Sequence, residues 1–202
     1  MALIPVDARQ VAAVVTFLEM ARPPKPSPVL TSPLRLVRWE TPSAQKYRIL
    51  FKRVGEPWLW FSRLVISDQE LGAILADPKV EVHAVFDPKG IEVGILELDF
   101  REPGGCEIAF FGLVPQLSGQ GLGRWLMAQA LTLGWRKDVR RMTVQTSSID
   151  DPRGLSLYLK TGFTPVSRAL HTFDDPRLLG MASPDAAPHV PMLKKPSAAT
   201  TP

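Results

Sequence analysis

The chain divides into stretches in which apolar and polar residues alternate and stretches in which apolar residues recur at every third or fourth position. Alternation is typical of a strand with one buried face, and the wider spacing is typical of an amphipathic helix. The pattern predicts strands at residues 33–40, 79–86, 91–100, 106–114 and 141–146, and a last strand or strand pair at 163–173. It predicts helices at residues 44–54, 68–75, 122–133 and 152–161. Residues 11–20 are apolar with a period that fits either a strand or a short helix.

Turn and cap residues support these boundaries. The segments 87–90 (Asp-Pro-Lys-Gly) and 103–105 (Pro-Gly-Gly) carry turn residues, so the three strands around them are predicted to form an antiparallel meander. The segment 150–152 (Asp-Asp-Pro) suits the start of a helix, and Gly162 suits its end. Strands that pair through short turns and helices that follow them fit a single domain of mixed α and β structure.

Residues 118–124 form a small turn, Ser-Gly-Gln-Gly-Leu-Gly-Arg, between a predicted strand and the longest predicted helix. Glycines at alternate positions leave the backbone amides of the helix N-terminus open to a ligand. Because the helix dipole favours negative charge there, the turn is a candidate phosphate or pyrophosphate site, although a plain tight turn has the same spacing. The P-loop and dinucleotide fingerprints are both excluded, since no Gly-Lys-Ser/Thr follows the turn and position 126 is leucine.

Composition and charge narrow the class of protein. The 202 residues, 45% of them hydrophobic, suit one domain with tails, and a net charge of +4 without a block of basic residues suits a small anionic ligand rather than a nucleic acid. The single cysteine argues against a disulfide framework and for a reducing compartment. No basic signal-peptide start and no apolar run long enough for a bilayer is present in the sequence, so we expect a cytoplasmic protein without a membrane partner.

Two motifs, together with the order of the predicted elements, resemble the GNAT N-acetyltransferase superfamily over residues 33–170. Residues 118–123 are similar to its acyl-CoA motif, Arg/Gln-x-x-Gly-x-Gly/Ala, and residues 157–163, Leu-Tyr-Leu-Lys-Thr-Gly-Phe, are similar to a second motif after the fifth strand of that fold. The segments 55–60, 107–113 and 151–155 look like those of an uncharacterised bacterial branch.

The resemblance implies an α/β (α+β) GNAT fold, with a mixed, mostly antiparallel central sheet flanked by helices. It divides the chain into an N-terminal extension with a proline-rich segment (1–32), the acetyltransferase domain (33–173) and a tail rich in proline and alanine (174–202).

The function that the resemblance implies is transfer of an acetyl group from acetyl-CoA to a primary amine, on a small molecule or a peptide, by direct attack in a ternary complex, without a metal. A homodimer is an assembly compatible with it. Ser118 departs from the usual Arg or Gln, so we expect weaker rather than absent CoA binding, with Gln120 and Arg124 as compensating contacts. The residues expected to bind CoA are Leu113, Val114, Ser118, Gly119, Gln120, Gly121, Leu122, Gly123 and Arg124.

Two residues match catalytic positions of the family. Glu107 matches the general base that deprotonates the acceptor ammonium, and its alternative is a carboxylate on a solvated strand face. Tyr158 matches the general acid that protonates the leaving thiolate, and its alternative is a packed tyrosine with a satisfied hydroxyl. A CoA-binding sensor that has lost catalysis, and a structural domain that binds nothing, remain alternatives to the enzyme.

The other chemically active side chains have simpler interpretations. His83, His171 and His189 lack the spacing of metal ligands, so no metal site is predicted. Cys106 is expected to be a small buried apolar residue. The aromatic cluster Trp58, Trp60 and Phe61 belongs either to the core or to the acceptor pocket, and residues 174–175 are expected to be an exposed turn.

Overall fold

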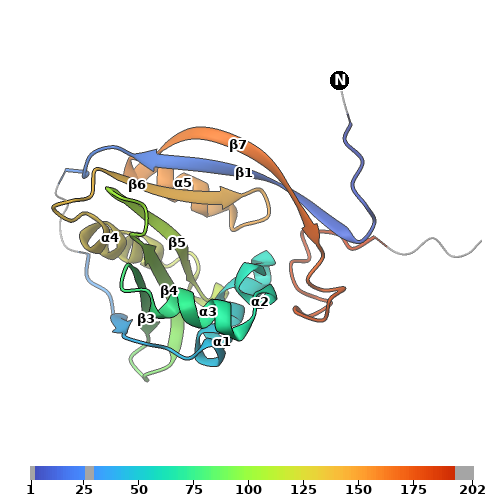
Figure 1. Cartoon of the computed structure of the whole chain (residues 1–202), viewed down its shortest axis with the longest axis horizontal. Helices are drawn as coiled ribbons and strands as arrows, with labels where there is room; N and C mark the ends of the chain where they lie inside the picture. Colours follow the sequence, from blue (N-terminus) through green and yellow to red (C-terminus); the bar gives the residue numbers. More distant parts are fainter. Residues whose placement is uncertain (1–2, 26–29, 194–202) are drawn as a thin grey trace, which may run out of the picture.

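A computed structural model describes residues 3–25 and 30–193, which form one seven-stranded sheet with helices on both faces (Figure 1). The strand order is β2-β3-β4-β5-β6-β1-β7, and all neighbours are antiparallel except β5 and β6. The strands are β1 (Gln10–Met20), β2 (Arg35–Trp39), β3 (Val80–Phe86), β4 (Glu92–Asp99), β5 (Gly105–Leu113), β6 (Arg141–Ser147) and β7 (Thr164–Asp174). The sheet is therefore mixed and mostly antiparallel, as the sequence predicts.

The helices fall into two groups, one on each face of the sheet. They are α1 (Ala44–Gly55), α2 (Ser62–Val65), α3 (Asp68–Ala76), α4 (Leu122–Gly134) and α5 (Pro152–Thr161), with short 3-10 turns η1 (Glu56–Trp58) and η2 (Pro115–Leu117). Ile95 of β4 packs with the apolar residues of α1 and α3, whereas its neighbour Leu96 packs with those of α4. Alternate side chains of one strand thus reach two different cores. No helix in the described part of the chain is long and apolar enough to cross a membrane.

Local sequence signals fix the ends of three of the four longer helices. Ser43 caps α1 by accepting from the amide of Lys46, and Ser67 forms a capping box with Glu70 at the start of α3. Asp151 caps α5 ahead of Pro152. The fourth, α4, begins at Gly121 with no side-chain cap. Its first amides are consequently left for another partner.

The segment 11–20, whose period fits a strand or a helix, is a strand. β1 lies between β6 and β7 and is antiparallel to both, so that Val15 is paired with Ser147 on one side and with Ala169 on the other. In Figure 1, β1 and β7 run together along one edge of the molecule. The start of the described chain is therefore an internal strand of the sheet, and residues 163–173 form one strand rather than a pair.

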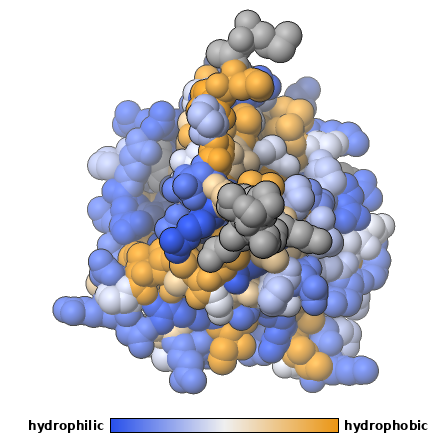
Figure 2. Space-filling view, turned by 90° about the vertical axis from the view of Figure 1, so that its right-hand side faces the viewer, coloured by the Kyte–Doolittle hydropathy of each residue, from blue (hydrophilic) through white to orange (hydrophobic). Residues whose placement is uncertain are grey.

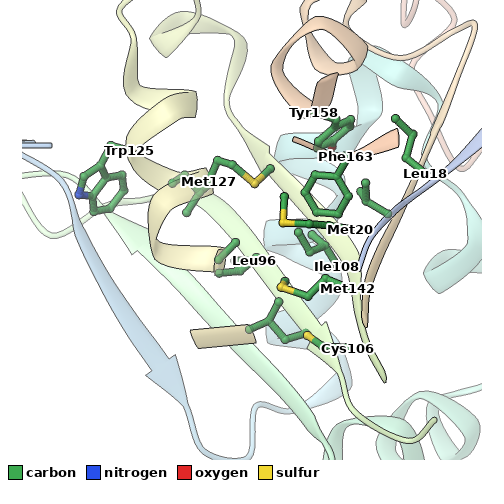
Figure 3. Packing of buried hydrophobic residues seen from close by; sticks show 14 of the residues in the cluster. Leu18, Met20, Leu96, Cys106, Ile108, Trp125, Met127, Met142, Tyr158 and Phe163 are labelled. Atoms are coloured by element: carbon green, nitrogen blue, oxygen red, sulfur yellow. The ribbon is translucent and has the colours of Figure 1, made fainter. Parts of the chain in front are cut away.

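The core beneath α4 and α5 brings together residues from most of the sheet. Leu126 and Met127 of α4 are almost fully buried with Leu98 and Ile108 of the sheet. Figure 3 shows Tyr158 beside Phe163 at one end of this cluster and Cys106 at the other. Cys106 is 1% exposed, and burial raises the pKa of its thiol to about 12, which fits a buried apolar role.

Residues 175–193 pack against the end of the sheet beyond β7. Asp175, expected in an exposed turn, is instead buried and ion-paired with Arg177 at 2.7 Å. The guanidinium of Arg177 also donates to the carbonyl oxygens of Ala186 (3.1 Å) and Val190 (2.7 Å), and these bonds fold the later residues over the ion pair. This segment covers Leu59 together with other apolar residues of both ends of the chain. Figure 2 views the molecule from this side and shows hydrophobic patches broken up by hydrophilic side chains.

Candidate active site

The sheet opens between its two parallel strands. β5 and β6 pair from Gly105 with Arg141 as far as Ile108 with Val144, and both strands then continue without pairing to each other. Ala109 lies in a bulge of β5, since Ile108 and Phe110 pair with consecutive residues of β4. A bulge bends its strand and ends regular pairing. The backbone edge of β5 beyond this point therefore faces a gap and not a neighbouring strand.

The glycine turn lies at one end of this gap. Gly119 and Gly121 both have left-handed backbone conformations, with φ of 79° and 75°, which glycine adopts without strain. No side chain caps the α4 N-terminus at Gly121. Two guanidinium groups flank the turn: a methyl group added at Gly121 would lie 3.6 Å from Nη2 of Arg124, and one added at Gly119 would lie 3.9 Å from Nη1 of Arg153. Open amides and two cations form an anion site.

A cavity of about 470 Å³ runs from the glycine turn through the gap to the other face of the sheet. Of the residues expected to bind CoA, Gln120 and Leu122 do not line it: Gln120 donates to the carbonyl oxygen of Gln116, and Leu122 packs in the core. The other seven do line it, namely Leu113, Val114, Ser118, Gly119, Gly121, Gly123 and Arg124. Arg153 also lines the cavity, and the spacing of the motifs contains no signal for it.

The two predicted catalytic residues lie in different places. Glu107 is on β5 within the paired stretch, opposite Asp99 of β4 and Thr143 of β6, and it is exposed outside the lining of the cavity. Its pKa is raised, first by desolvation and then by the carboxylates of Asp99 and Glu97. Tyr158 of α5 does line the cavity. The structure does not bring these two side chains together in one pocket.

Tyr158 keeps its proton in this setting. The residue is 6% exposed, and burial, followed by the charge of Asp150, raises the pKa of the phenol. The hydroxyl of Tyr47 donates to Glu97, whereas only burial and the charge of Asp150, and no hydrogen bond from the described residues, act on the Tyr158 phenol. A protonated hydroxyl at the cavity wall is available to donate to a ligand.

Asp150 also lines the cavity, although the sequence pattern predicts only a helix start at this position. Its Oδ2 accepts from the amide of Ser147 at 2.7 Å and from the hydroxyl of Thr146 at 3.1 Å, while Oδ1 has one longer contact, 3.3 Å from Nε1 of Trp60. Burial raises its pKa, and these hydrogen bonds oppose the shift. Asp150 forms no ion pair within residues 3–25 and 30–193. Tertiary packing of β6 and Trp60 around the start of α5 creates this environment, and no local sequence signal predicts it.

Trp60 reaches Asp150 because two glycines make room for it. A methyl group at Gly55 would come within 2.5 Å of the Trp60 ring system, and one at Gly112 would come within 3.2 Å of it. The indole packs against Phe51 and Phe110, so its ring is fixed and its edge points to the carboxylate. Trp60 is thus both a core residue and a residue of the cavity wall, the two alternatives predicted for the aromatic cluster.

The end of the cavity beyond Asp150 is aromatic. Phe61 stacks on Phe173 with ring centroids 4.3 Å apart, and His171 lies 5.1 Å from Phe173. Trp58, Leu59 and Ser62 also line the cavity. Among the described residues, no group of three or more His, Cys, Asp or Glu is placed to hold a metal ion.

A second hollow, of about 490 Å³, lies on the other face of β1. Val14 and Thr16 line it, whereas Ala13 and Val15 line the first cavity, as expected for alternate residues of a strand. The two spaces share Trp58, Thr146, Ser147, Asp150 and Asp151. Asp150 therefore stands where the two hollows meet.

This arrangement coincides with a known family. The sequence pattern of the Acetyltransferase (GNAT) family matches residues 18–163. The chain belongs to this family. Its turn at 118–124, the opening between β5 and β6 and the helix that carries Tyr158 all lie within the matched GNAT region. Among curated proteins, none matches the chain.

Solved structures share the GNAT fold at low sequence identity. A GCN5-related N-acetyltransferase from Sphaerobacter thermophilus has a TM-score of 0.59 and 18% identity over 82% of this chain and 52% of its own. A tandem GNAT protein from the clavulanic acid biosynthesis pathway has a TM-score of 0.52 and 15% identity over 81% of this chain and 53% of its own. A dodecameric spermidine N-acetyltransferase from Vibrio cholerae has a TM-score of 0.52 and 16% identity over 74% of this chain and 98% of its own. The chain spans about half the length of the first two.

Proposed function

We propose that this GNAT acetyltransferase moves an acetyl group from acetyl-CoA to a primary amine by direct attack in a ternary complex. The observation that carries the proposal is the single cavity that joins an uncapped, glycine-lined helix N-terminus to the opening between β5 and β6 and to the Tyr158 hydroxyl. A long donor with phosphates at one end and a thioester at the other fits such a space.

The phosphate end of the donor finds its partners at the turn. The amides at the start of α4 and the guanidinium of Arg124 supply hydrogen bonds and positive charge, and Arg153, which also pairs with Asp151 at 2.8 Å, adds a second cation. These groups would hold the pyrophosphate, a role for which the family usually has Arg or Gln at the position of Ser118. Glycine at 119 and 121 keeps side chains away from the backbone that the phosphates approach.

The acyl end of the donor lies along the free edge of β5. Residues 109–113 present backbone groups that β6 does not pair with, and such groups bind the amides of an extended ligand as an added strand would. Tyr158 is the proposed acid for the leaving thiolate, because its phenol is protonated and the residue lines the cavity. Glu107 is the base that the family resemblance suggests, and it lies outside the lining of the cavity.

The test measures release of the CoA thiol when purified protein is mixed with acetyl-CoA and a panel of primary amines. We expect an amine-dependent rate and mass-spectrometric detection of the acetylated product. The rival, a sensor without catalysis, predicts that acetyl-CoA raises the melting temperature while no amine accelerates thiol release. A protein whose melting temperature does not respond to acetyl-CoA would contradict both.

We further propose that the protein works in the cytoplasm and self-associates. A cytoplasmic location is supported by the single buried cysteine, which suits a reducing compartment, and self-association is supported by the dodecameric assembly named for the Vibrio cholerae neighbour. Light scattering of the purified chain measures the assembly directly, and a monomer at all concentrations would contradict it.

A further inference from the structure

The acceptor end of the cavity has a charge pattern that restricts the amine. Four ordinarily charged residues line the whole space: Arg124 and Arg153 at the glycine turn, Asp151, which is paired with Arg153, and Asp150. Among the described residues, Asp150 is thus the lining acid that is left without a cation. Beyond it, the wall is mostly aromatic and aliphatic, with His171 and the uncharged polar side chain of Ser62.

Asp150 has room for one more partner. A carboxylate offers about four acceptor positions, and Asp150 uses two of them on Oδ2 at 2.7 and 3.1 Å. Its Oδ1 holds only the long contact of 3.3 Å with Trp60. A single ammonium group would complete the set with a charge-assisted hydrogen bond, and it would offset the cost of a half-buried, unpaired charge.

The same carboxylate is close to the proposed acid. A methyl group placed on Gly154 would lie 3.8 Å from Oγ1 of Thr146, which donates to Asp150, and 3.9 Å from Cε2 of Tyr158. Both residues line the cavity, and the charge of Asp150 contributes to the raised pKa of the Tyr158 phenol, so an amine bound at Asp150 would lie in the same part of the cavity as the proposed acid.

We propose that the acceptor is a hydrophobic monoamine, with its ammonium held and deprotonated by Asp150 and its apolar body packed against Phe61, His171 and Phe173. This rests on the proposed acetyl transfer and names its substrate class. An ammonium proton passes to Asp150, which loses it to solvent through the second hollow. The neutral nitrogen attacks the thioester carbon, the C–N bond forms and the C–S bond breaks. The sulfur takes the Tyr158 proton, and the proton lost by the new amide nitrogen restores the phenol.

The first experiment compares acceptors that differ by one feature. With acetyl-CoA, 2-phenylethylamine should have a kcat/KM at least ~10-fold above n-propylamine, which lacks the ring, and above phenylalanine, which adds a carboxylate repelled by Asp150. Spermidine should also be poor, because its further charges would lie against an apolar wall. A preference for spermidine, phenylalanine or n-propylamine would overturn the proposal and leave acetyl transfer standing.

The second experiment changes the site. Asp150→Asn should lower kcat/KM for 2-phenylethylamine by ~100-fold or more, and by more than Glu107→Gln does, whereas exposed Asp174→Asn should not change it. Phe61→Leu should raise KM for 2-phenylethylamine more than for n-propylamine, and Phe100→Leu, half-buried outside the cavity, should raise neither. A normal melting shift with CoA shows that each variant is folded. Wild-type activity in Asp150→Asn would overturn the proposal.

A binding measurement separates this inference from the proposed function. If no amine is acetylated, titration of 2-phenylethylamine into protein saturated with CoA still tests the site. Binding that Asp150→Asn abolishes would support the amine site and contradict acetyl transfer, and absence of binding would overturn both.

Discussion

Asp150 and Asp151 are adjacent carboxylates with opposite environments. Burial raises the pKa of Asp150, and no cation offsets it among the described residues. Burial alone would also raise the pKa of Asp151, but hydrogen bonds from the guanidinium and amide of Arg153 outweigh it and lower the pKa. One residue thus costs stability when ionised, and the other contributes stability when ionised.

The two aspartates should therefore have opposite effects on the pH dependence of unfolding. From the ordinary Asp pKa of ~3.9 upward to its raised value, native Asp150 binds more protons than the unfolded chain does, so its contribution to stability falls as pH rises. Asp150→Asn should remove this loss of stability, so the free energy of unfolding of the variant should rise relative to that of the wild type as pH increases from 3.5 to 7. Asp151 contributes stability above ~3.9 that is lost as pH falls through its lowered pKa. Asp151→Asn should therefore become less stable relative to the wild type as pH rises from that lowered pKa through ~3.9, and the difference should then stay constant at higher pH.

Urea unfolding curves at several pH values measure both differences. Asparagine also caps helices, so the Asp151 substitution keeps the start of α5. Parallel pH profiles for the two variants would contradict the assignment of opposite environments.

Tyr158→Phe separates an acid from a packing residue. The substitution removes only the hydroxyl, on which no hydrogen bond from the described residues acts, so folding and CoA affinity should be nearly intact. If the hydroxyl protonates the thiolate, kcat should fall roughly 10²–10³-fold. Equal falls in kcat and kcat/KM would mark an interaction made only in the transition state. Wild-type rates, with chemistry shown to be limiting, would assign Tyr158 to the core.

At the scale of elements, α4 differs from the other long helices in how it begins. Side chains of Ser43, Ser67 and Asp151 satisfy the amides of α1, α3 and α5, whereas the amides of α4 have no such cap. Uncapped amides at a helix N-terminus that is flanked by cations form a binding site for an anion. The adjoining gap exists because β5 bulges at Ala109 just where its pairing with β6 ends.

An acidic side chain at the α4 start should abolish donor binding. Gly123 has helical geometry, and a methyl group there would meet nothing nearer than 3.7 Å, so Gly123→Asp should fold. Its carboxylate would repel the pyrophosphate, and acetyl-CoA should no longer raise the melting temperature. Gly72→Asp on α3 is the matched control, because that glycine is also helical with open space around it, and it should keep the shift. An unchanged shift in Gly123→Asp would place the donor elsewhere.

At the scale of the whole molecule, both flanks of the GNAT region help to build the site. β1 contributes Ala13 and Val15 to the cavity wall, and the segment 175–193 covers Leu59 and Phe173. Within that segment Arg177 is the central link, since it joins Asp175 to the carbonyl groups of two later turns.

Removal of Arg177 should loosen this end of the molecule. Arg177→Ala leaves the buried carboxylate of Asp175 without its cation, which should destabilise the protein by roughly 3 kcal/mol. Denaturant unfolding measures the loss, and limited proteolysis should cut first within residues 178–193. Arg153→Ala is a suitable comparison, because its pair with Asp151 is largely exposed and should cost less than about 1 kcal/mol. Equal losses in the two variants would contradict the special role of the C-terminal segment.

The sequence by itself determined the elements and the phosphate end of the site. Serine, aspartate and glycine signals act within three or four residues, so the caps at Ser67 and Asp151 and the left-handed turn at 119–121 could be predicted before any tertiary contact was known. The same holds for the strand alternation that separates Ile95 from Leu96.

Tertiary structure alone decided the acceptor end. Residues 11–20 carry apolar side chains at a period that fits two conformations, and pairing with β6 and β7, more than 120 residues away, made them a strand. Asp150 looked like part of a helix start until Trp60, Thr146 and the aromatic wall were folded around it. A carboxylate can be solvated, ion-paired or unpaired in a cavity, and which of these holds depends on groups that are distant in the chain. A local sequence pattern contains no information about those groups.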